Sequence, residues 1–214
     1  MLGGWVDHFA EIAEERRGFA DFIEGLSPQQ LATLSLCSAW TVRDLAAHLV
    51  VPLVTGRGAV MLELIKAGGN FDRVNLTLTH AMAAKPTSEL LALLRRHADS
   101  RFAPPGVGSI APLMDVIVHG QDARRPLGID REIPLDRLVA VLDFLASRAS
   151  RRGAFGQGRA PALRFEASDI RWGHGDGPLV SGPAEALMMS LAGRRCGLDD
   201  LSGDGVGTFA SKAQ

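Results

Sequence analysis

The stretch CSAWTVRDLAAHL, residues 37–49, contains the clearest helix start in the chain. Thr41 offers a hydroxyl that caps a helix, and Asp44 follows three positions later, which completes a capping-box pattern. The apolar residues that follow predict one long helix that ends at a glycine pair, residues 68–69. A kink is expected at Pro52, because proline removes one backbone donor from a helix.

The segments on both sides of this stretch also predict helices. In each of them apolar residues recur every three to four positions or a capping residue begins the segment. These segments are residues 5–26, 27–34, 71–84, 89–101, 111–125 and a last one that Pro134 opens. Short breaks separate the segments and no internal repeat relates them. Residues 1–150 are therefore predicted to form an antiparallel helical bundle.

The composition changes after residue 150. Residues 151–160 are rich in glycine and arginine, which is typical of a linker. Short strands are predicted at residues 163–167, 179–180 and 206–210, with a helix that Pro183 opens between the last two. Residues 161–214 are therefore predicted to form a small α+β domain.

The overall composition excludes several classes of protein. The 214 residues include 23 Lys and Arg and 24 Asp and Glu, for a formal net charge of −1, and 46% are hydrophobic. A disordered segment would be less apolar, and a nucleic-acid-binding protein is usually basic. Acidic residues near the start interrupt the apolar run that a signal peptide needs, and residues 45–54 are too short to span a membrane. We therefore expect a cytoplasmic protein that binds neither nucleic acid nor membrane.

Cysteine and lysine are both scarce. The two cysteines, Cys37 and Cys196, are too few for a disulfide framework or a cysteine zinc site, and we interpret them as thiols in a reducing compartment. The only lysines are Lys66, Lys85 and Lys212, so arginine carries nearly all of the positive charge. This bias indicates a GC-rich genome.

Three polar residues share one apolar helix face in the segment from residue 111 to 125. Asp115 and His119 are four residues apart, and Asp122 returns to the same stripe after seven. If this face is buried, its polar side chains cost folding free energy unless a partner pairs with them. A divalent cation is one candidate partner. His48, from the helix that Thr41 caps, would complete a three-ligand site with an open fourth position, which is typical of catalytic zinc.

The spacing of these residues also fits other interpretations. A single histidine on an apolar helix face, such as His48, is more often a hydrogen-bonded core residue. An aspartate and a histidine four residues apart, such as Asp115 and His119, often form only a local ion pair. From spacing alone, a metal site and a purely structural cluster are about equally supported.

Several stretches, taken in their order along the chain, together resemble the sequence of a known family. They are residues 37–49, residues 115–128 (DVIVHGQDARRPLG), residues 163–169, Trp172, residues 175–177 and residues 182–187. Together they resemble the mycothiol-dependent maleylpyruvate isomerase family, a branch of the DinB-like metal-binding bundles. The resemblance extends over nearly the whole chain. It implies a mainly α fold, with a DinB-like antiparallel four-helix bundle followed by a small α+β domain of the sterol-carrier-protein-like kind.

The resemblance also implies a metal centre. A divalent metal, usually zinc, would be held by His48, Asp115 and His119, and Asp122 would orient His119 from behind. The family has glutamate where this chain has Asp115. A carboxylate that is one methylene shorter changes its reach toward a metal and a substrate.

Mycothiol is the cosubstrate that the resemblance implies, so the reactive sulfur would come from a small molecule. A metal deprotonates a coordinated thiol, and the thiolate would add to an electron-poor double bond. Elimination after bond rotation gives isomerisation, and retention of the adduct gives S-transfer. Arg164, Arg171 and Arg194 are candidates to hold a substrate carboxylate. The arginine bias, which indicates a GC-rich genome, agrees with an actinobacterial source. Actinobacteria have GC-rich genomes and make mycothiol.

Two other functions remain open at this point. One is a metal-dependent hydrolase, in which bound water replaces the thiol. The other is a non-catalytic stress protein that binds a metal or a small ligand. The sequence leaves open the electrophile, the native metal and the oligomeric state.

Overall fold

The structure is a computed structural model, which describes residues 7–37, 40–104, 106–147, 150 and 163–211. The chain divides into two compact units. We call residues 7–103 and 115–131 the N-terminal unit, and residues 104–114 and 132–211 the C-terminal unit.

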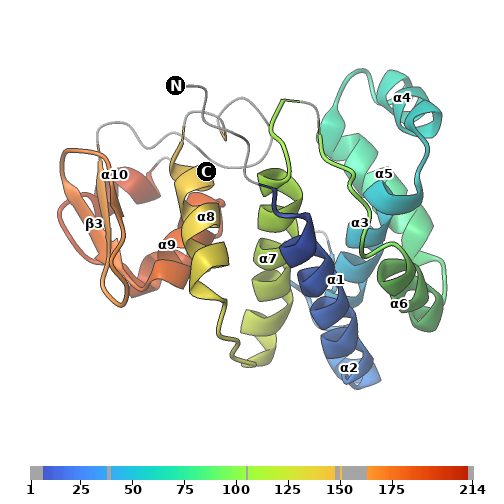
Figure 1. The fold of residues 1–214 in the computed structure, drawn as a ribbon, viewed down its shortest axis with the longest axis horizontal. Coiled ribbons are helices and arrows are strands. Elements are labelled where there is room, and N and C mark those ends of the chain that lie inside the picture. Colours follow the sequence, from blue (N-terminus) through green and yellow to red (C-terminus); the bar gives the residue numbers. More distant parts are fainter. Residues whose placement is uncertain (1–6, 38–39, 105, 148–149, 151–162, 212–214) are drawn as a thin grey trace. The chain divides into compact units, whose positions relative to one another are not determined.

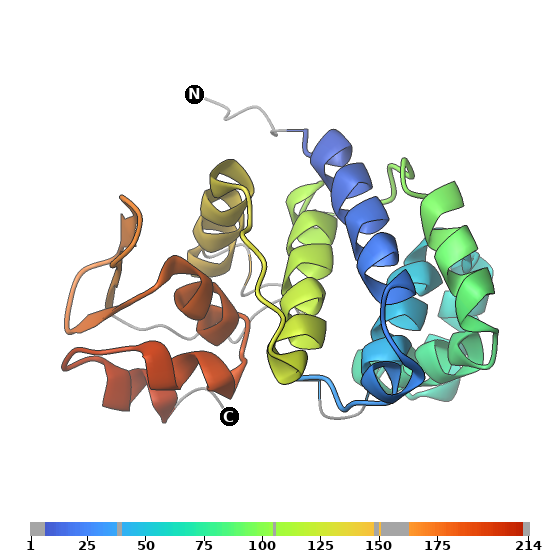
Figure 2. The ribbon, with the colours of Figure 1, turned by 90° about the horizontal axis from the view of Figure 1, so that it is seen from below.

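Helices make up the N-terminal unit. They are α1 (Phe9–Glu24), α2 (Pro28–Leu31), α3 (Val42–Val54), α4 (Arg57–Lys66), α5 (Phe71–Ala83), α6 (Thr87–Arg96), the main part of α7 (Ile110–Arg124) and a short 3-10 turn, η1 (Arg125–Leu127). Figures 1 and 2 show α1 and α6 side by side, and α3 packs against both α5 and α6. The apolar stripes expected from the three-to-four spacing form the core, with Ile12, Leu45 and Leu90 fully buried.

The start of α3 forms as the sequence predicts. The Thr41 hydroxyl accepts a hydrogen bond from the Asp44 N–H (3.2 Å), and the Asp44 carboxylate accepts one from the Thr41 N–H (2.9 Å). Arg43, in the first turn, donates to the Thr87 hydroxyl (2.9 Å) and to the Ala83 carbonyl (2.8 Å). The beginning of α3 is thereby fixed to the connection between α5 and α6.

The prediction of one long helix kinked at Pro52 is wrong. Pro52 lies inside α3, and the chain turns later, so that α3 and α4 are bent by 116°. Thr55 is extended, with φ −82° and ψ 119°, and Gly56 then begins α4. Because Pro52 removes a donor from the last turn of α3, that turn is easily ended, and the extended Thr55 redirects the chain. No single helix in the described residues is long and apolar enough to cross a membrane, and only the bent pair α3 and α4 meets the length and composition together.

Two helix ends in the N-terminal unit differ from the predictions. The capping box at Ser27 is present, but α2 ends at Leu31 and not near residue 34. Leu34 instead forms an isolated bridge with Thr41, which begins the approach to α3. α6 ends at Arg96, earlier than the expected residue 101.

The C-terminal unit combines helices with a small sheet. Its elements are α8 (Leu135–Ala146), β1 (Arg164–Ala167), β2 (Gly173–His174), β3 (Leu179–Gly182), α9 (Ala184–Leu191), η3 (Arg195–Asp200) and α10 (Val206–Ala210). The strand order is β2-β1-β3, with β1 antiparallel to β2 and parallel to β3. α9 packs against α8 and against the sheet, and Phe165 of β1 and Leu187 of α9 are both buried.

The prediction of a last strand at residues 206–210 is wrong, because this segment is the helix α10. A five-residue apolar run fits a strand or a single helical turn equally well. Residues 206–210 follow Ser202, which already pairs with Ser181 of β3 through an isolated bridge. This position favours the helical turn over a further strand. The helical turn directs Phe209 onto Phe165, with ring centroids 5.2 Å apart.

A mainly helical chain with one small three-stranded sheet confirms the predicted fold class. The expected linker, residues 151–160, lies outside the described residues. The division of the chain near residue 150 stays a prediction. α8 is grouped with the C-terminal unit.

Candidate metal centre

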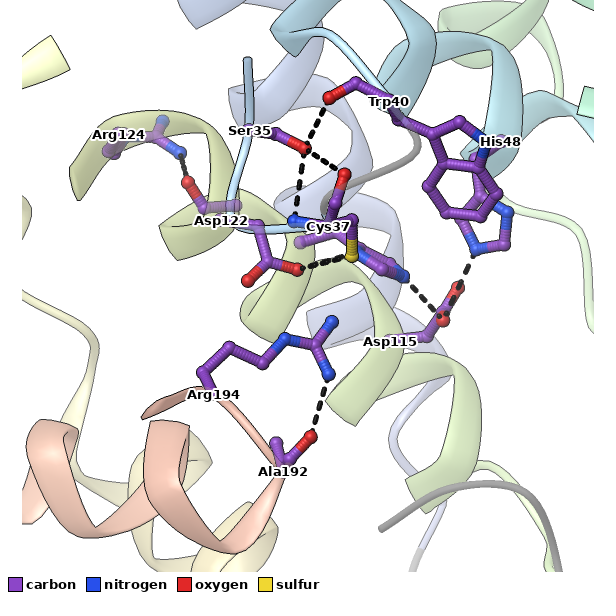
Figure 3. Close-up of polar contacts among 11 residues, drawn as sticks. Ser35, Cys37, Trp40, His48, Asp115, Asp122, Arg124, Ala192 and Arg194 are labelled. Carbon is purple, nitrogen blue, oxygen red and sulfur yellow. Dashed lines mark hydrogen bonds and ion pairs between the residues drawn. The ribbon is translucent and has the colours of Figure 1, made fainter. Parts of the chain in front are cut away.

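Two helices of the N-terminal unit bring three predicted ligands together. His48 comes from the middle of α3, and Asp115 and His119 come from successive turns of α7. Asp115 Oδ1 lies 3.6 Å from His48 Nε2 and 3.4 Å from His119 Nε2. The three ligand atoms lie within 4.8 Å of one another. Figure 3 shows the Asp115 carboxylate directed toward the His48 ring.

The spacing of these atoms suits a small divalent cation. Zinc binds nitrogen and oxygen at about 2.0–2.1 Å, so neighbouring ligand atoms of a tetrahedral site are about 3.3 Å apart. The two distances to Asp115 Oδ1, 3.6 Å and 3.4 Å, are close to this edge and longer than an ordinary hydrogen bond. One carboxylate oxygen and two imidazole nitrogens are a usual donor set for zinc.

Exposure within the cluster is uneven. The side chains of His48 and His119 are each only 10% exposed, whereas the side chain of Asp115 is 31% exposed. The cluster is therefore open on the side of Asp115. An opening beside three ligands leaves room for a fourth ligand from solution.

The charges of the cluster stabilise one another. Burial alone would raise the pKa of Asp115, but His119 and His48 outweigh it and hold that pKa below its usual range. Burial alone would lower the pKa of His119, but Asp115 and Asp122 outweigh it and raise that pKa well above 6.5. Without a metal, His119 therefore favours its protonated form, and a cation bound there has to displace a proton.

Asp122 lies behind His119, on the side away from Asp115. Its Oδ2 is 2.8 Å from His119 Nδ1, and its side chain is completely buried. A carboxylate at this distance holds a proton on Nδ1 and leaves Nε2 to face Asp115. This is the position expected for a residue that orients His119. The metal roles of all four residues stay predictions.

The sequence interpretation missed Trp40. Its indole stacks on the His48 ring, with centroids 4.6 Å apart and an interplanar angle of 28°. It also meets the His119 ring edge-on at 6.1 Å. Trp40 precedes the helix and has no place in its periodicity, so no spacing rule indicates it.

Cys37 was also missed, since we interpreted it only as a thiol in a reducing compartment. Its Sγ lies 3.2 Å from Asp122 Oδ2 and 3.7 Å from His119 Nδ1. Figure 3 shows this sulfur directed at the Asp122 carboxylate. Neither Cys37 nor Cys196 is in a disulfide. Cys37, His119 and Asp122 form a second group of potential metal ligands.

Arg16 is a third residue that the spacing did not indicate. It is only 4% exposed, and its Nη1 donates to the carbonyls of Ala98 (2.9 Å) and Ser100 (3.0 Å). Burial lowers the pKa of Arg16, while the negative charge of Asp115 opposes this shift. A fixed positive charge therefore acts on the acidic ligand of the cluster.

The arginines proposed to bind substrate lie in the C-terminal unit. Arg164 Nε is 3.4 Å from a carboxylate oxygen of Glu166. Arg194 Nη1 donates to the Ala192 carbonyl at 2.7 Å, as Figure 3 shows. Arg171 is exposed in the bend before β2. Their role in substrate binding stays a prediction.

Comparison with known proteins identifies a domain in the first half of the chain. Residues 12–104 match the model of the mycothiol maleylpyruvate isomerase N-terminal domain. The match includes His48 and ends before Asp115 and His119. No curated protein matches the chain.

Two solved structures share the fold. One is a crystal structure of the mycothiol-dependent maleylpyruvate isomerase, with a TM-score of 0.57 and 17% identity. The other is a histidine-to-alanine mutant of the mycothiol-dependent maleylpyruvate isomerase, with a TM-score of 0.55 and 14% identity. Each likeness covers 92% of this chain and 95% of the other. At these identities the likeness establishes the fold.

Proposed function

We propose, on the premise that residues 12–104 belong to the N-terminal domain family of the mycothiol maleylpyruvate isomerases, that this chain is a mycothiol-dependent enzyme. The match confirms the resemblance noted in the sequence for residues 12–104. That family supports an enzyme of the isomerase or transferase kind. The proposed substrate is a small electrophile with an electron-poor double bond.

One observation carries this proposal. The Nε2 atoms of two buried histidines, His48 and His119, face a single oxygen of Asp115 at 3.6 Å and 3.4 Å. We infer that these three side chains hold a divalent cation, with zinc as the proposed metal. When bound, such a cation would bring the pKa of a thiol into the neutral range, so that mycothiol reacts as a thiolate.

The protein's own residues prepare this site. Asp122 keeps the proton of His119 on Nδ1, so the lone pair of Nε2 faces the centre. Trp40 covers the His48 ring and limits both its rotation and the access of water. Arg16 places a fixed positive charge within range of Asp115, which favours anionic reactants at the opening.

The proposed reaction begins when the sulfur of mycothiol forms a bond to one carbon of the double bond. The electron pair of that double bond moves onto the conjugated carbonyl, and the former double bond becomes a single bond that can rotate. If the electron pair returns, the carbon–sulfur bond breaks and the isomer and the thiolate are released. If the adduct is protonated instead, the product is an S-conjugate of mycothiol. Arg164, Arg171 and Arg194 remain the proposed partners of a substrate carboxylate.

The test is an assay of the purified protein with maleylpyruvate as the first electrophile. We expect turnover only when mycothiol is present, loss of turnover after chelation, and recovery when zinc is added. S-methylated mycothiol is the matched control, because it keeps the sugar framework and blocks the thiol. Turnover without mycothiol would overturn the proposal in favour of a metal-dependent hydrolase. Absence of turnover with a range of electrophiles would favour a non-catalytic binding protein. A cytoplasmic location and an actinobacterial source stay predictions.

A further inference from the structure

Cys37 contacts the residue that orients a proposed metal ligand. Its Sγ donates to Asp122 Oδ2 at 3.2 Å, and the same oxygen is 2.8 Å from His119 Nδ1. We propose that Cys37 is a positioning residue, whose S–H holds the Asp122 carboxylate in the orientation that directs His119 Nε2 toward the metal centre. This inference rests on the proposed function, because it concerns the same centre.

The burial of Asp122 makes its hydrogen bonds consequential. The side chain is 0% exposed, so its carboxylate depends on hydrogen bonds from protein groups and not from bulk water. Oδ2 receives Cys37 and His119 together, and these two donors come from different segments of the chain. Two donors on one oxygen oppose rotation of the carboxylate about its own axis. Loss of the Cys37 donor would therefore loosen the support of His119.

The position of Cys37 is itself fixed by backbone contacts. The Leu36 N–H donates to the backbone carbonyl of Asp122 at 3.1 Å. The Ser35 hydroxyl accepts from the Cys37 N–H (3.2 Å) and donates to the Trp40 carbonyl (2.8 Å). Residues 36 and 37 thus hold both the backbone and the side chain of Asp122. This double attachment supports a positioning role more strongly than the thiol contact alone.

The alternative role for Cys37 is that of a direct ligand. Cys37 Sγ, His119 Nδ1 and Asp122 Oδ2 are close enough to share a thiophilic cation. The 2.8 Å separation of His119 and Asp122, however, is the length of a charge-assisted hydrogen bond. His119 also presents its other nitrogen to Asp115. These two observations favour the positioning role, and the experiment below separates the two roles.

The experiment measures Co²⁺ binding to the full chain and to three variants. Cys37→Ala removes the donor, Cys37→Ser keeps a donor, and Cys196→Ala is the matched control in the C-terminal unit. Affinity is measured by competition with a chromophoric chelator, and circular dichroism checks the fold of each variant. We expect Cys37→Ala to weaken Co²⁺ binding by about 10-fold, as is typical of residues behind a ligand. Cys37→Ser is expected to restore most of the affinity, and Cys196→Ala to leave it unchanged.

Four outcomes contradict the inference, and they are distinguishable. Equal affinity of Cys37→Ala and the unaltered protein removes any positioning role. Equal weakening by Cys37→Ala and Cys37→Ser shows that donation of a hydrogen bond is not the cause. A sulfur-to-cobalt charge-transfer band that disappears in Cys37→Ala shows that Cys37 is a ligand. If the unaltered protein binds no Co²⁺, the metal centre of the proposed function fails as well.

Discussion

The two units of the chain differ in what they bury. In the described part of the N-terminal unit, charged and imidazole side chains lie in the interior: Glu15, Arg16, His48, His119, Asp122 and Arg124. In the described part of the C-terminal unit, the buried polar side chains are the serines Ser109, Ser150 and Ser190. Because burying a charge is costly unless it is paired, the N-terminal unit is the one shaped around polar chemistry.

Within the N-terminal unit, buried charges outside the cluster have close partners. Arg131 contacts both carboxylate oxygens of Glu15, at 2.7 Å and 2.6 Å. The guanidinium of Arg124 lies 3.8 Å from the centre of the Phe22 ring. The contacts of Asp115 with its two histidines, at 3.6 Å and 3.4 Å, are wider. The closely paired groups stabilise the fold, and the wider cluster is the one with space for a ligand.

Removal of a proposed ligand should give the largest effect. We expect His48→Ala to weaken binding of zinc by more than about 100-fold, beyond the range typical of residues behind a ligand, and to abolish turnover. Elemental analysis of purified protein measures the metal content. His174→Ala is the matched control, since His174 is exposed in β2 of the C-terminal unit. A stoichiometric metal in His48→Ala would refute the proposed ligand set.

A core substitution in the C-terminal unit should change stability without changing the site. Leu187 is 0% exposed in α9, so Leu187→Ala is expected to cost about 2–5 kcal/mol of unfolding free energy. Urea unfolding followed by circular dichroism measures this loss. The folded variant should retain its full zinc content. Loss of zinc from a folded Leu187→Ala protein would break the division of roles between the units.

A buried pair that is not part of the wider cluster should behave as a structural element. Glu15→Gln leaves the Arg131 guanidinium without its carboxylate, and we expect a loss of about 2 kcal/mol. This value lies below that for a fully buried pair, because the Arg131 side chain is 24% exposed. The double variant Glu15→Gln, Arg131→Met should recover part of the loss. Chemical denaturation measures both, and an unchanged stability of Glu15→Gln would show that the pair contributes nothing.

The stability of the metal-free protein should change with pH, by less than the substitutions above change it. The folded protein raises the pKa of His119 above 6.5, so it binds that proton more tightly than the unfolded chain does. The resulting stabilisation is complete below pH 6.5 and is lost as the pH rises through the folded pKa. Asp115 acts in the opposite range, since its lowered pKa stabilises the fold above pH 3.8 and this contribution is lost in acid.

Thermal unfolding across this range measures the dependence. Metal-free protein should lose stability above pH 6.5. With excess zinc the loss should vanish or reverse, because the cation replaces the proton. His119→Gln should flatten the metal-free profile. Metal-free stability that rises above pH 6.5 would contradict the proposed electrostatics of the cluster.

Local patterns predicted the parts of the site that lie on helices. The capping box of Thr41 and Asp44 located α3, and the four-residue spacing placed Asp115 and His119 on one face of α7. Trp40 and Cys37 could not be predicted in this way. They lie before α3, and the contacts of Cys37 with Asp122 and of Trp40 with His119 join residues far apart in the sequence. No local period encodes such a contact.

The errors in the fold have related causes. Pro52 was expected to bend a helix, but the turn occurs at Thr55, where the backbone is already extended. Alternation correctly indicated β1 and glycine-rich turns correctly indicated β3, whereas β2 is only two residues long and exposed. Residues 206–210 form a helix because β3 is already paired with Ser202. In the last two cases a very short segment or a tertiary contact overrides the local preference.

The most direct test of the metal centre is anomalous X-ray diffraction at the zinc edge from crystals of zinc-loaded protein. The proposed function predicts one strong peak, about 2.0–2.1 Å from His48 Nε2, Asp115 Oδ1 and His119 Nε2. A peak bonded instead to Cys37 Sγ and His119 Nδ1 would contradict it, as would the absence of any peak within reach of His48.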